Sequence, residues 1–434
     1  MHPGPLPAGK LGLPLIGETL AYAKNPFQFI EDRIADHGPV FKSRLLLKKA
    51  VVMAGPEACE RFVNPSLMQR AGAFPPFVQK LFGGKSLPFQ DGDVHLERKQ
   101  IVLNAFTDSA LSSYLPAMQR IVEASFQSWA VLGEFSWLDR LKRLAFETIA
   151  TNMLSLSPGP QMQQLQSDYE AVSCGLVSLP IPLPGTTYWK ALRARKRIFA
   201  TLEPILKQRK ASPNGDGVSR ILSATSSDGT ALTVDEAVLE THHAFIAGFI
   251  VFAQMASAVL FSNAHRRVSQ LLAEEIKSVP RGKTLTVDDL GKLRYLGQFV
   301  MEVKRLCPII PAVFAKAKKD FEIHGVTVPA GWLVFWAVRS TNVYRDSFPD
   351  RLQFNPGRFA TPPVNPFVFV PQGGGPETGH RCAGFDYSAM LLEIFTIVLI
   401  RDYVANLSNP AAPYDWKLNP PQPVDGLMAT VSPA

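Results

Sequence analysis

Cysteine is scarce in this sequence, and its spacing excludes two common uses. The chain has 434 residues, and no two of its four cysteines have the CxxC spacing of a zinc finger or a redox dithiol: Cys59, Cys174, Cys307 and Cys382. Each thiol therefore has to be interpreted alone. Few, unpaired cysteines are typical of a reducing compartment, so we expect a cytoplasmic protein.

Charge is also sparse. Only 19% of the residues are charged, whereas 46% are hydrophobic and 28 are phenylalanines, a composition that disfavours disorder. The net charge of +8 comes from scattered Lys and Arg rather than from a basic stripe. We therefore expect no nucleic-acid partner. A basic face would suit an acidic protein or the carboxylates of a cofactor.

Long hydrophobic runs are missing except at one place. The opening segment MHPGPLPAGKLGLPLIGETL is interrupted by Pro and Gly and lacks the apolar core of a signal peptide, so we expect no membrane anchor. Residues 244–261 (AFIAGFIVFAQMASAVLF) carry no charge and have the length of a borderline membrane span. Because the run continues into NAHRRVSQLLAEE at helical spacing, it predicts a buried helix through a globular fold.

Helical periodicity dominates the remaining sequence. Segments such as NPFQFIEDRIADHG and LPAMQRIVEASFQSWA repeat apolar residues every three or four positions. Strand patterns are confined to residues 38–55, residues 310–340 and a short stretch near the end, DGLMATVSP. We predict a mainly α protein with small β-sheets (α+β), a single large domain over residues 1–434, and a monomer.

A glycine-rich loop with one cysteine is the strongest chemical signal. The sequence FVFVPQGGGPETGHRCAG leads directly into the apolar helix FDYSAMLLEIFTIVLI, which places Cys382 at the mouth of that helix. Backbone N–H groups and the positive helix end stabilise a thiolate there. The surrounding glycines let the chain approach a flat ligand without Cβ clashes: Gly373, Gly374, Gly375, Gly379 and Gly384. An ordinary glycine loop around a buried cysteine is the alternative.

Three charged patterns accompany this loop. Glu302 and Arg305 are three residues apart, so they lie on one helical face and can pair. Arg358, in FPDRLQFNPGRF, could join them in a buried network, although exposed pairs of this kind are common and contribute little. A third cluster lies on one helical turn of DGDVHLERKQ, where a solvated surface is the alternative: His95, Arg98 and Lys99.

Together, and in their order along the chain, these four features resemble the cytochrome P450 family. The resemblance covers nearly the whole chain. The resemblance implies the P450 fold, a heme b cofactor and an enzyme that oxidises a lipophilic small molecule. It implies that Cys382 is the proximal iron ligand and that Gly375 and Gly384 lie in its loop. The structural network behind the heme would be Glu302, Arg305 and Arg358, and the propionate partners would be His380, His95, Arg98 and Lys99.

One branch of the family looks similar in more detail. PQGGG followed by GHRC resembles the cysteine loop of the bacterial fatty-acid peroxygenases, and Gly375 stands where oxygen-using members have a Phe. Peroxygenases take oxygen and oxidising equivalents from hydrogen peroxide and need no redox partner. The resemblance therefore implies either hydrogen peroxide or a ferredoxin/reductase system as the source of oxidising equivalents.

The central helix departs from both groups. Oxygen-using members carry an acid followed by an alcohol, and if Ala247-Gly248 begins that motif, the two positions are Ile250 and Val251. The peroxygenases carry Arg-Pro, and an ungapped comparison puts Ile246-Ala247 there. None of these side chains donates a proton. The nearest titratable groups are His242 and His243, for which we expect a position beyond the heme, closing the start of the helix.

Three activities therefore stay open. In the first, which we favour, substrate or ordered water supplies the proton and the enzyme oxidises its substrate with peroxide or dioxygen. In the second, it rearranges a hydroperoxide, as allene oxide synthase-type relatives do, a group that GPETG also resembles. In the third, it is a heme-binding or sensing protein without turnover. Residues 66–90 and 174–186, rich in Pro, Leu and Phe, are expected to line a lipophilic pocket.

Overall fold

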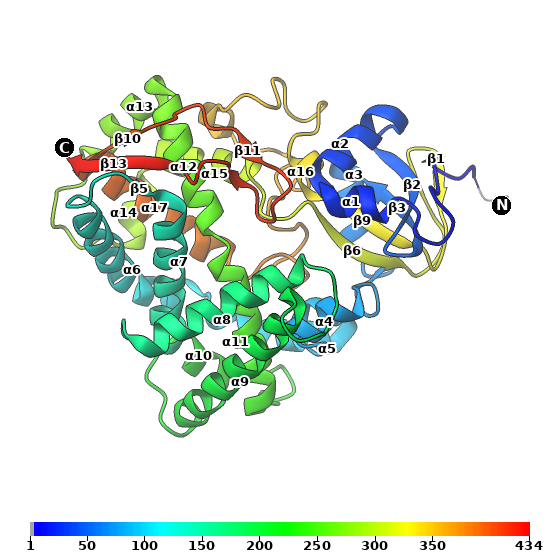
Figure 1. Ribbon diagram of the computed structural model, residues 1–434, viewed down its shortest axis with the longest axis horizontal. Helices are drawn as coiled ribbons and strands as arrows, with labels where there is room; N and C mark the ends of the chain where they lie inside the picture. Colours follow the sequence, from blue (N-terminus) through cyan, green and yellow to red (C-terminus); the bar gives the residue numbers. More distant parts are fainter. Residues whose placement is uncertain (1–3) are drawn as a thin grey trace.

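The computed structural model describes residues 4–434, and helices make up most of them (Figure 1). The predicted class, mainly α with small sheets, is confirmed. The β-rich part lies at the end of the molecule that carries the N-terminus, and the helices fill the rest. Strands occur in both segments where the sequence predicted them, residues 38–55 and 310–340.

The largest sheet joins strands from opposite ends of the chain. β3 pairs in parallel with β9, so that Val51 lies opposite Val334. Tyr22, Phe29 and Phe335 pack on one side of this sheet. The strand order in space is β1 (Ala8–Gly9), β2 (Val40–Leu45), β3 (Lys48–Met53), β9 (Leu333–Ala337), β6 (Ala312–Ala317) and β4 (Met68–Gln69).

Smaller sheets and short helices complete the β-rich part and the C-terminus. The strand predicted near the end of the chain is β13, which pairs with β10 and β5. The bounds are β5 (Phe135–Ser136), β7 (Phe321–Ile323), β8 (Val326–Val328), β10 (Tyr403–Leu407), β11 (Tyr414–Asp415), β12 (Gln422–Pro423), β13 (Met428–Pro433), α1 (Thr19–Lys24), α2 (Pro26–His37), α3 (Pro56–Val63) and α16 (Val338–Asn342).

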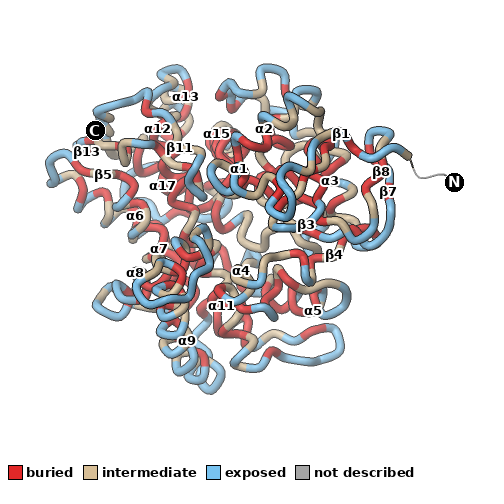
Figure 2. Tube along the Cα trace, turned by 45° about the vertical axis from the view of Figure 1, so that its right-hand side comes forward, coloured by how far each residue is buried: buried red, intermediate tan, exposed pale blue. Residues whose placement is uncertain are grey.

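The helical part is built around one apolar core, which Figure 2 shows as the buried stretches around α12, α15 and α17. Its helices are α4 (Pro76–Phe82), α5 (Gly92–Leu103), α6 (Asp108–Trp129), α7 (Trp137–Leu154), α8 (Pro160–Leu176), α9 (Thr187–Ala211), α10 (Gly217–Ser223), α11 (Val234–Phe249), α12 (Phe252–Ala264), α13 (Arg266–Ile276), α14 (Val287–Lys292), α15 (Arg294–Leu306) and α17 (Phe385–Asp402).

The long apolar run forms α11 and α12. In the described part of the chain, the stretch Val234–Ala264 is the one helical segment long and apolar enough to cross a membrane, and 72% of its most apolar window is buried inside the fold. The prediction of a buried central helix is therefore confirmed. A capping box of Thr233 and Glu236 begins α11.

The run is not one straight helix, because α11 ends and α12 begins around Ile250 and Val251. At this break the N–H of Val251 donates to the carbonyl of Gly248 at 3.4 Å. Gly248 also lets α11 approach α7 closely, since a Cβ there would lie 2.9 Å from Ile149. The break follows closely after Ala247-Gly248. It therefore lies at Ile250 and Val251, the positions compared above with the acid and alcohol of oxygen-using relatives.

Candidate active site

The cysteine loop is a tight turn held against the body of the protein. The N–H of Cys382 donates to the carbonyl of Gln372 at 3.0 Å. Gly373 and Gly375 have φ of +94° and +85°, which side chains rarely adopt. A Cβ at Gly374 would lie 2.6 Å from the sulfur of Cys59, so that buried cysteine packs behind the loop.

Cys382 itself is half-buried and lies just before the amino end of α17. Gly384 is the N-cap of α17, so the positive end of this 18-residue helix points toward the thiol. Cys174 is exposed, and Cys307 is buried, which raises the pKa of its thiol. Of the four cysteines, only Cys382 combines a helix amino end with partial exposure.

Two residues of α5 face the cysteine loop from one side. The ring of His95 lies 3.9 Å from that of His380, and Lys99, one turn later, donates to the carbonyl of Arg381 at 2.5 Å. Burial, reinforced by the nearby Lys99, lowers the pKa of His95 to about 4. Burial and neighbouring positive groups also lower the pKa of His380, to about 2. This crowding of basic groups suits an anionic ligand.

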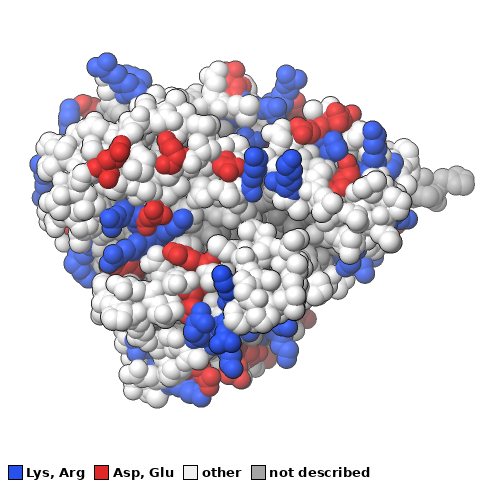
Figure 3. Space-filling view, in the orientation of Figure 1, with Lys and Arg blue, Asp and Glu red and all other residues white. Residues whose placement is uncertain are grey.

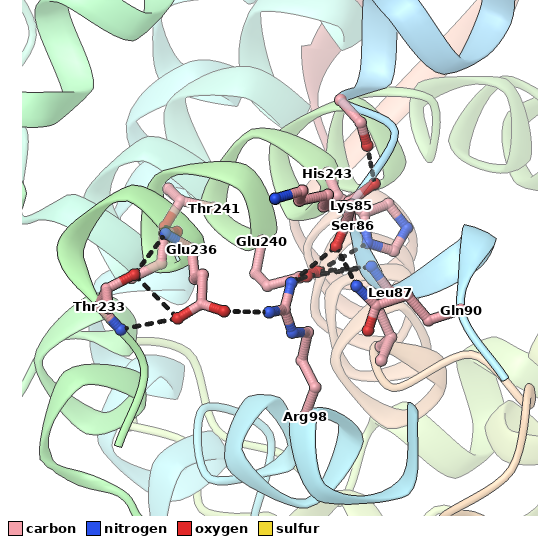
Figure 4. A network of polar contacts seen from close by, with 12 residues as sticks. Lys85, Ser86, Leu87, Gln90, Arg98, Thr233, Glu236, Glu240, Thr241 and His243 are labelled. Atoms are coloured by element: carbon pink, nitrogen blue, oxygen red, sulfur yellow. Dashed lines mark hydrogen bonds and ion pairs between the residues drawn. The ribbon is translucent and has the colours of Figure 1, made fainter. Parts of the chain in front are cut away.

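Arg98 differs from the sequence expectation. Its guanidinium donates to Glu236 at 2.5 Å, to Glu240 at 3.3 Å and to the carbonyl of Lys85 at 2.7 Å. Figure 4 shows it reaching between the two carboxylates of α11. Because successive helical residues point about 100° apart, Lys99 and Arg98 leave α5 on different faces. Arg98 is therefore not a free propionate partner but a link between α5 and α11.

Glu302, Arg305 and Arg358 meet in one buried ion network. Arg305 forms two hydrogen bonds to Glu302, at 2.7 and 2.8 Å, and Arg358 forms one at 3.0 Å. Glu302 and Arg305 are fully buried. Arg305 also donates to the backbone carbonyls of Asn342 and Arg351, so the network fixes the loops around the sheet to α15.

A second buried cation, which the sequence reasoning overlooked, lies beside this network. The amino group of Lys304 donates to Gln372, Ser388 and the carbonyl of Phe385 at 2.8–2.9 Å. The side-chain amide of Gln372 in turn lies 3.7 Å from the sulfur of Cys382. Burial lowers the pKa of Lys304 to about 7, and the nearby Cys382 acts against that shift. The only signal in the sequence was a lysine between the buried Glu302 and Arg305.

One face of α11 stays partly exposed although most of the helix is buried. His243, Ala244, Ala247 and Ile250 are half-buried, at helical spacing, whereas Ile246 is 4% exposed and belongs to the core. Ile246, which an ungapped comparison puts at the peroxygenase Arg position, therefore does not belong to this half-exposed face.

Three further apolar residues of this segment also lie in the core. Phe245 is fully buried and stacks on Tyr169 at 5.3 Å, and Phe249 packs against Phe146 at 6.2 Å. Val251 is 3% exposed. An evenly apolar sequence does not reveal which face of a helix is buried, so none of these three positions could be assigned from the sequence.

The two histidines of α11 have different environments. His242 is fully buried, with Nε2 2.9 Å from the carbonyl of Leu81 and Nδ1 3.3 Å from the hydroxyl of Tyr169. Burial lowers its pKa to about 3. His243 is on the half-exposed face, and its Nδ1 lies 3.7 Å from a carboxylate oxygen of Glu240. Neither closes the start of α11, which Thr233 caps.

Phenylalanines form a continuous wall next to His243. The ring of Phe82 lies 6.1 Å from His243 and 5.9 Å from Phe89, and Phe74 bridges Phe89 and Phe314 at 4.9 and 5.3 Å. Three of these rings, Phe74, Phe82 and Phe89, come from residues 66–90, and Phe314 comes from β6. Of residues 174–186, the first three end α8 and the rest form a largely exposed loop, in which Leu179 is 73% exposed. Figure 3 shows that the middle of this face of the molecule is hollowed, with few charged groups at the hollow.

Comparison with known proteins agrees with this geometry. The family model described as cytochrome P450 matches residues 7–423. The chain belongs to the cytochrome P450 family. It is 31% identical to the putative cytochrome P450 120 of Synechocystis, covering 99% of this chain and 94% of that protein. It is 30% identical to the taxane 10-beta-hydroxylase of Taxus cuspidata, over 99% and 90%.

Solved P450 structures share the whole fold. Retinoic acid-bound cyanobacterial CYP120A1 has a TM-score of 0.90 at 30% identity, covering 99% of this chain and all of that one. P450 OleT in complex with arachidonic acid has a TM-score of 0.86, at 23% identity and with 100% and 99% coverage. The family prediction is confirmed, and the likeness to OleT shows the shared fold alone.

P450s bind heme b, and the residues of this P450 fit that group. Among residues 4–434, no cluster of three or more His, Cys, Asp and Glu is placed to hold a bare metal ion. The half-buried thiol of Cys382 offers a single sulfur donor for the heme iron, and the buried basic groups of His95 and Lys99 suit propionates.

Proposed function

We propose that this P450 hydroxylates a lipophilic isoprenoid, using hydrogen peroxide as oxidant, with Cys382 as the iron ligand of a single heme domain. The observation that carries the proposal is the half-exposed face of α11, which meets a wall of phenylalanines and offers one ionisable side chain, His243. Such a surface binds an apolar molecule through burial of its skeleton.

The relatives support the substrate class. Their names refer to retinoic acid, a taxane, beta-amyrin and ent-kaurenoic acid, which are all isoprenoid skeletons. Several are named as hydroxylases, oxidases or monooxygenases, which favours oxygenation over hydroperoxide rearrangement. Without an arginine on the half-exposed face of α11, a simple fatty acid has no fixed anchor there, so a rigid isoprenoid suits the wall better.

Each part of the site has its own task in this proposal. Bound heme supplies oxygen activation, and thiolate ligation favours cleavage of the O–O bond. His95, Lys99 and His380 hold the propionates, and the phenylalanine wall excludes water and orients the substrate. His243 holds and returns a proton at its imidazole, with Glu240 behind it to orient the ring.

The oxidant follows from the missing donors. Ile250 and Val251 cannot move protons, so the route from dioxygen, which consumes two protons and two electrons, lacks its usual delivery groups. Hydrogen peroxide brings both protons with it and requires only that one be moved between its oxygens. One imidazole is enough for that transfer.

The test is retinoic acid hydroxylation by the holoenzyme with hydrogen peroxide alone, compared with a ferredoxin, its reductase and NADPH. We expect product with peroxide alone, and His243→Gln should lower turnover about 100-fold, within the range for a general acid-base, while the substrate-induced spectral shift is retained. Product only with the electron-transfer proteins would refute the peroxide assignment. His243→Gln with full turnover would refute the proton role, and an absent spectral shift in the native enzyme would refute the substrate class.

A further inference from the structure

The buried lysine behind the cysteine loop has no carboxylate partner. Lys304 is fully buried, and its three hydrogen-bond acceptors, on Gln372, Ser388 and Phe385, are all uncharged. In the part of the chain that the structure describes, no acidic group forms an ion pair with it. A buried ammonium group without a counter-ion is costly, so such a cation is normally paired with an anion.

Three acidic groups act on this charge, the Cys382 thiol, Asp386 and Glu393, and the thiol has the largest effect. Gln372 links Lys304 to this thiol: its side-chain oxygen accepts from Lys304 at 2.9 Å, and its side-chain amide lies 3.7 Å from the Cys382 sulfur. The N–H of Cys382 also donates to the carbonyl of Gln372, so the loop backbone fixes the position of that amide. When the oxygen of an amide accepts a hydrogen bond from a cation, the amide is polarised. The hydrogen bond that its N–H group donates then becomes stronger.

The bonds around Ser388 make this arrangement rigid. The Ser388 hydroxyl lies 3.3 Å from the Gln372 oxygen and 2.9 Å from the Phe385 carbonyl, and the lysine also lies 4.0 Å from the centre of the Phe385 ring. The ammonium group is thus surrounded on several sides by groups from the first turn of α17 and from the cysteine loop. Its charge is held at a defined place behind the sulfur.

We propose that Lys304 and Gln372 form a charge-assisted hydrogen-bond relay to the Cys382 thiolate, which raises the reduction potential of the heme iron. Hydrogen bonds to a ligating sulfur, and positive charge near it, withdraw electron density from the metal. A less electron-rich iron accepts an electron more easily and forms a weaker bond to sulfur. Lys304 and Gln372 are positioning residues for the ligand, and the inference rests on the proposed ligation by Cys382.

The test compares the holoenzyme with two variants. Gln372→Glu is isosteric and still accepts from Lys304, but it removes the donor to sulfur and adds a negative charge. Lys304→Met removes the charge at similar side-chain length. For both, we expect about a tenfold lower ratio of reduced to oxidised iron at a fixed potential, which is about 59 mV for one electron. The iron–sulfur stretching frequency, measured by resonance Raman spectroscopy, should rise. Ser388→Ala keeps the relay and is the matched control, with the smallest shift.

The readouts separate the possible outcomes. A structural role alone would lower heme content or the unfolding temperature but leave the potential and the stretching frequency of the remaining holoprotein unchanged, and that result would overturn the proposal. If Lys304→Met fails to fold, Gln372→Glu decides by the same two measurements. If the native protein lacks the carbon monoxide band of thiolate-ligated heme, the proposed ligation fails instead.

Discussion

The two sides of the heme site differ in how they use polar groups. On the Cys382 side, three charged side chains are fully buried, Glu302, Lys304 and Arg305, and each is held by several hydrogen bonds. On the α11 side, the half-exposed face offers one titratable group, His243, among apolar residues. The chain therefore fixes the electrostatics behind the iron by itself, whereas the chemistry in front depends on what the substrate and oxidant bring.

The sharpest way to break this comparison is to remove the sulfur. Cys382→Ser should abolish the carbon monoxide band of thiolate-ligated heme, because no other described cysteine combines partial exposure with a helix amino end. The measurement is the difference spectrum of the reduced, carbon monoxide-bound protein. Cys174→Ser, at an exposed position, and Cys59→Ser are the controls and should retain the band. An intact band in Cys382→Ser would end the heme-thiolate assignment.

The ion network should give the next largest effect, on stability. Arg305→Ala leaves Glu302 buried with a weaker partner, which costs roughly 3–5 kcal/mol and should yield mostly heme-free protein. Arg358→Ala removes one hydrogen bond to the same carboxylate from a side chain that is 11% exposed, and should cost roughly 1.5–3 kcal/mol. Heme content and thermal unfolding check this order. Equal effects would show that Glu302 does not depend on its buried partner.

The neighbouring residues Lys99 and Arg98 of α5 should have different roles, the first in holding heme and the second in stability. Lys99→Gln should increase the rate of heme loss to apomyoglobin, because Lys99 lies beside the cysteine loop. Arg98→Gln should leave that rate near native but lower stability by roughly 1.5–3 kcal/mol, since Glu240 loses a charged donor. Faster heme loss in Arg98→Gln than in Lys99→Gln would restore Arg98 as a propionate partner.

The smallest effect at neutral pH, where it vanishes, is a pH dependence of stability from His242. Its pKa is about 3 in the fold, below its ordinary value of about 6.5, because burial disfavours the charged ring. The unfolded chain therefore binds the proton first, and stability is lost as pH falls below about 6.5, by at most about 1.4 kcal/mol per pH unit. His242→Gln should flatten the unfolding temperature between pH 6.5 and 4.5. His324→Asn, on an exposed turn, should not, and an unchanged slope in His242→Gln would contradict the prediction.

The contacts that could be predicted from the sequence were those between residues a few positions apart. Glu302 and Arg305 lie three residues apart on a helix, so their pairing needs no knowledge of the tertiary fold. The faces of α11 could not be predicted, because residues 244–261 are apolar all round and periodicity then gives no direction. Lys304 was missed for a related reason: its place between Glu302 and Arg305 does not by itself show whether the lysine is buried or solvated.

The pairing of β3 with β9 also determines when the largest sheet can form during synthesis. Residues 48–53 leave the ribosome early, but their parallel partner at residues 333–337 follows only after most of the helices have been synthesised. Until then β3 exposes an open strand edge, the kind of surface on which nascent chains aggregate. The cysteine loop and α17 come later still, so heme can be captured only after these helices and the last strand of the sheet have been synthesised, and yield in a host cell should depend on heme supply at that stage.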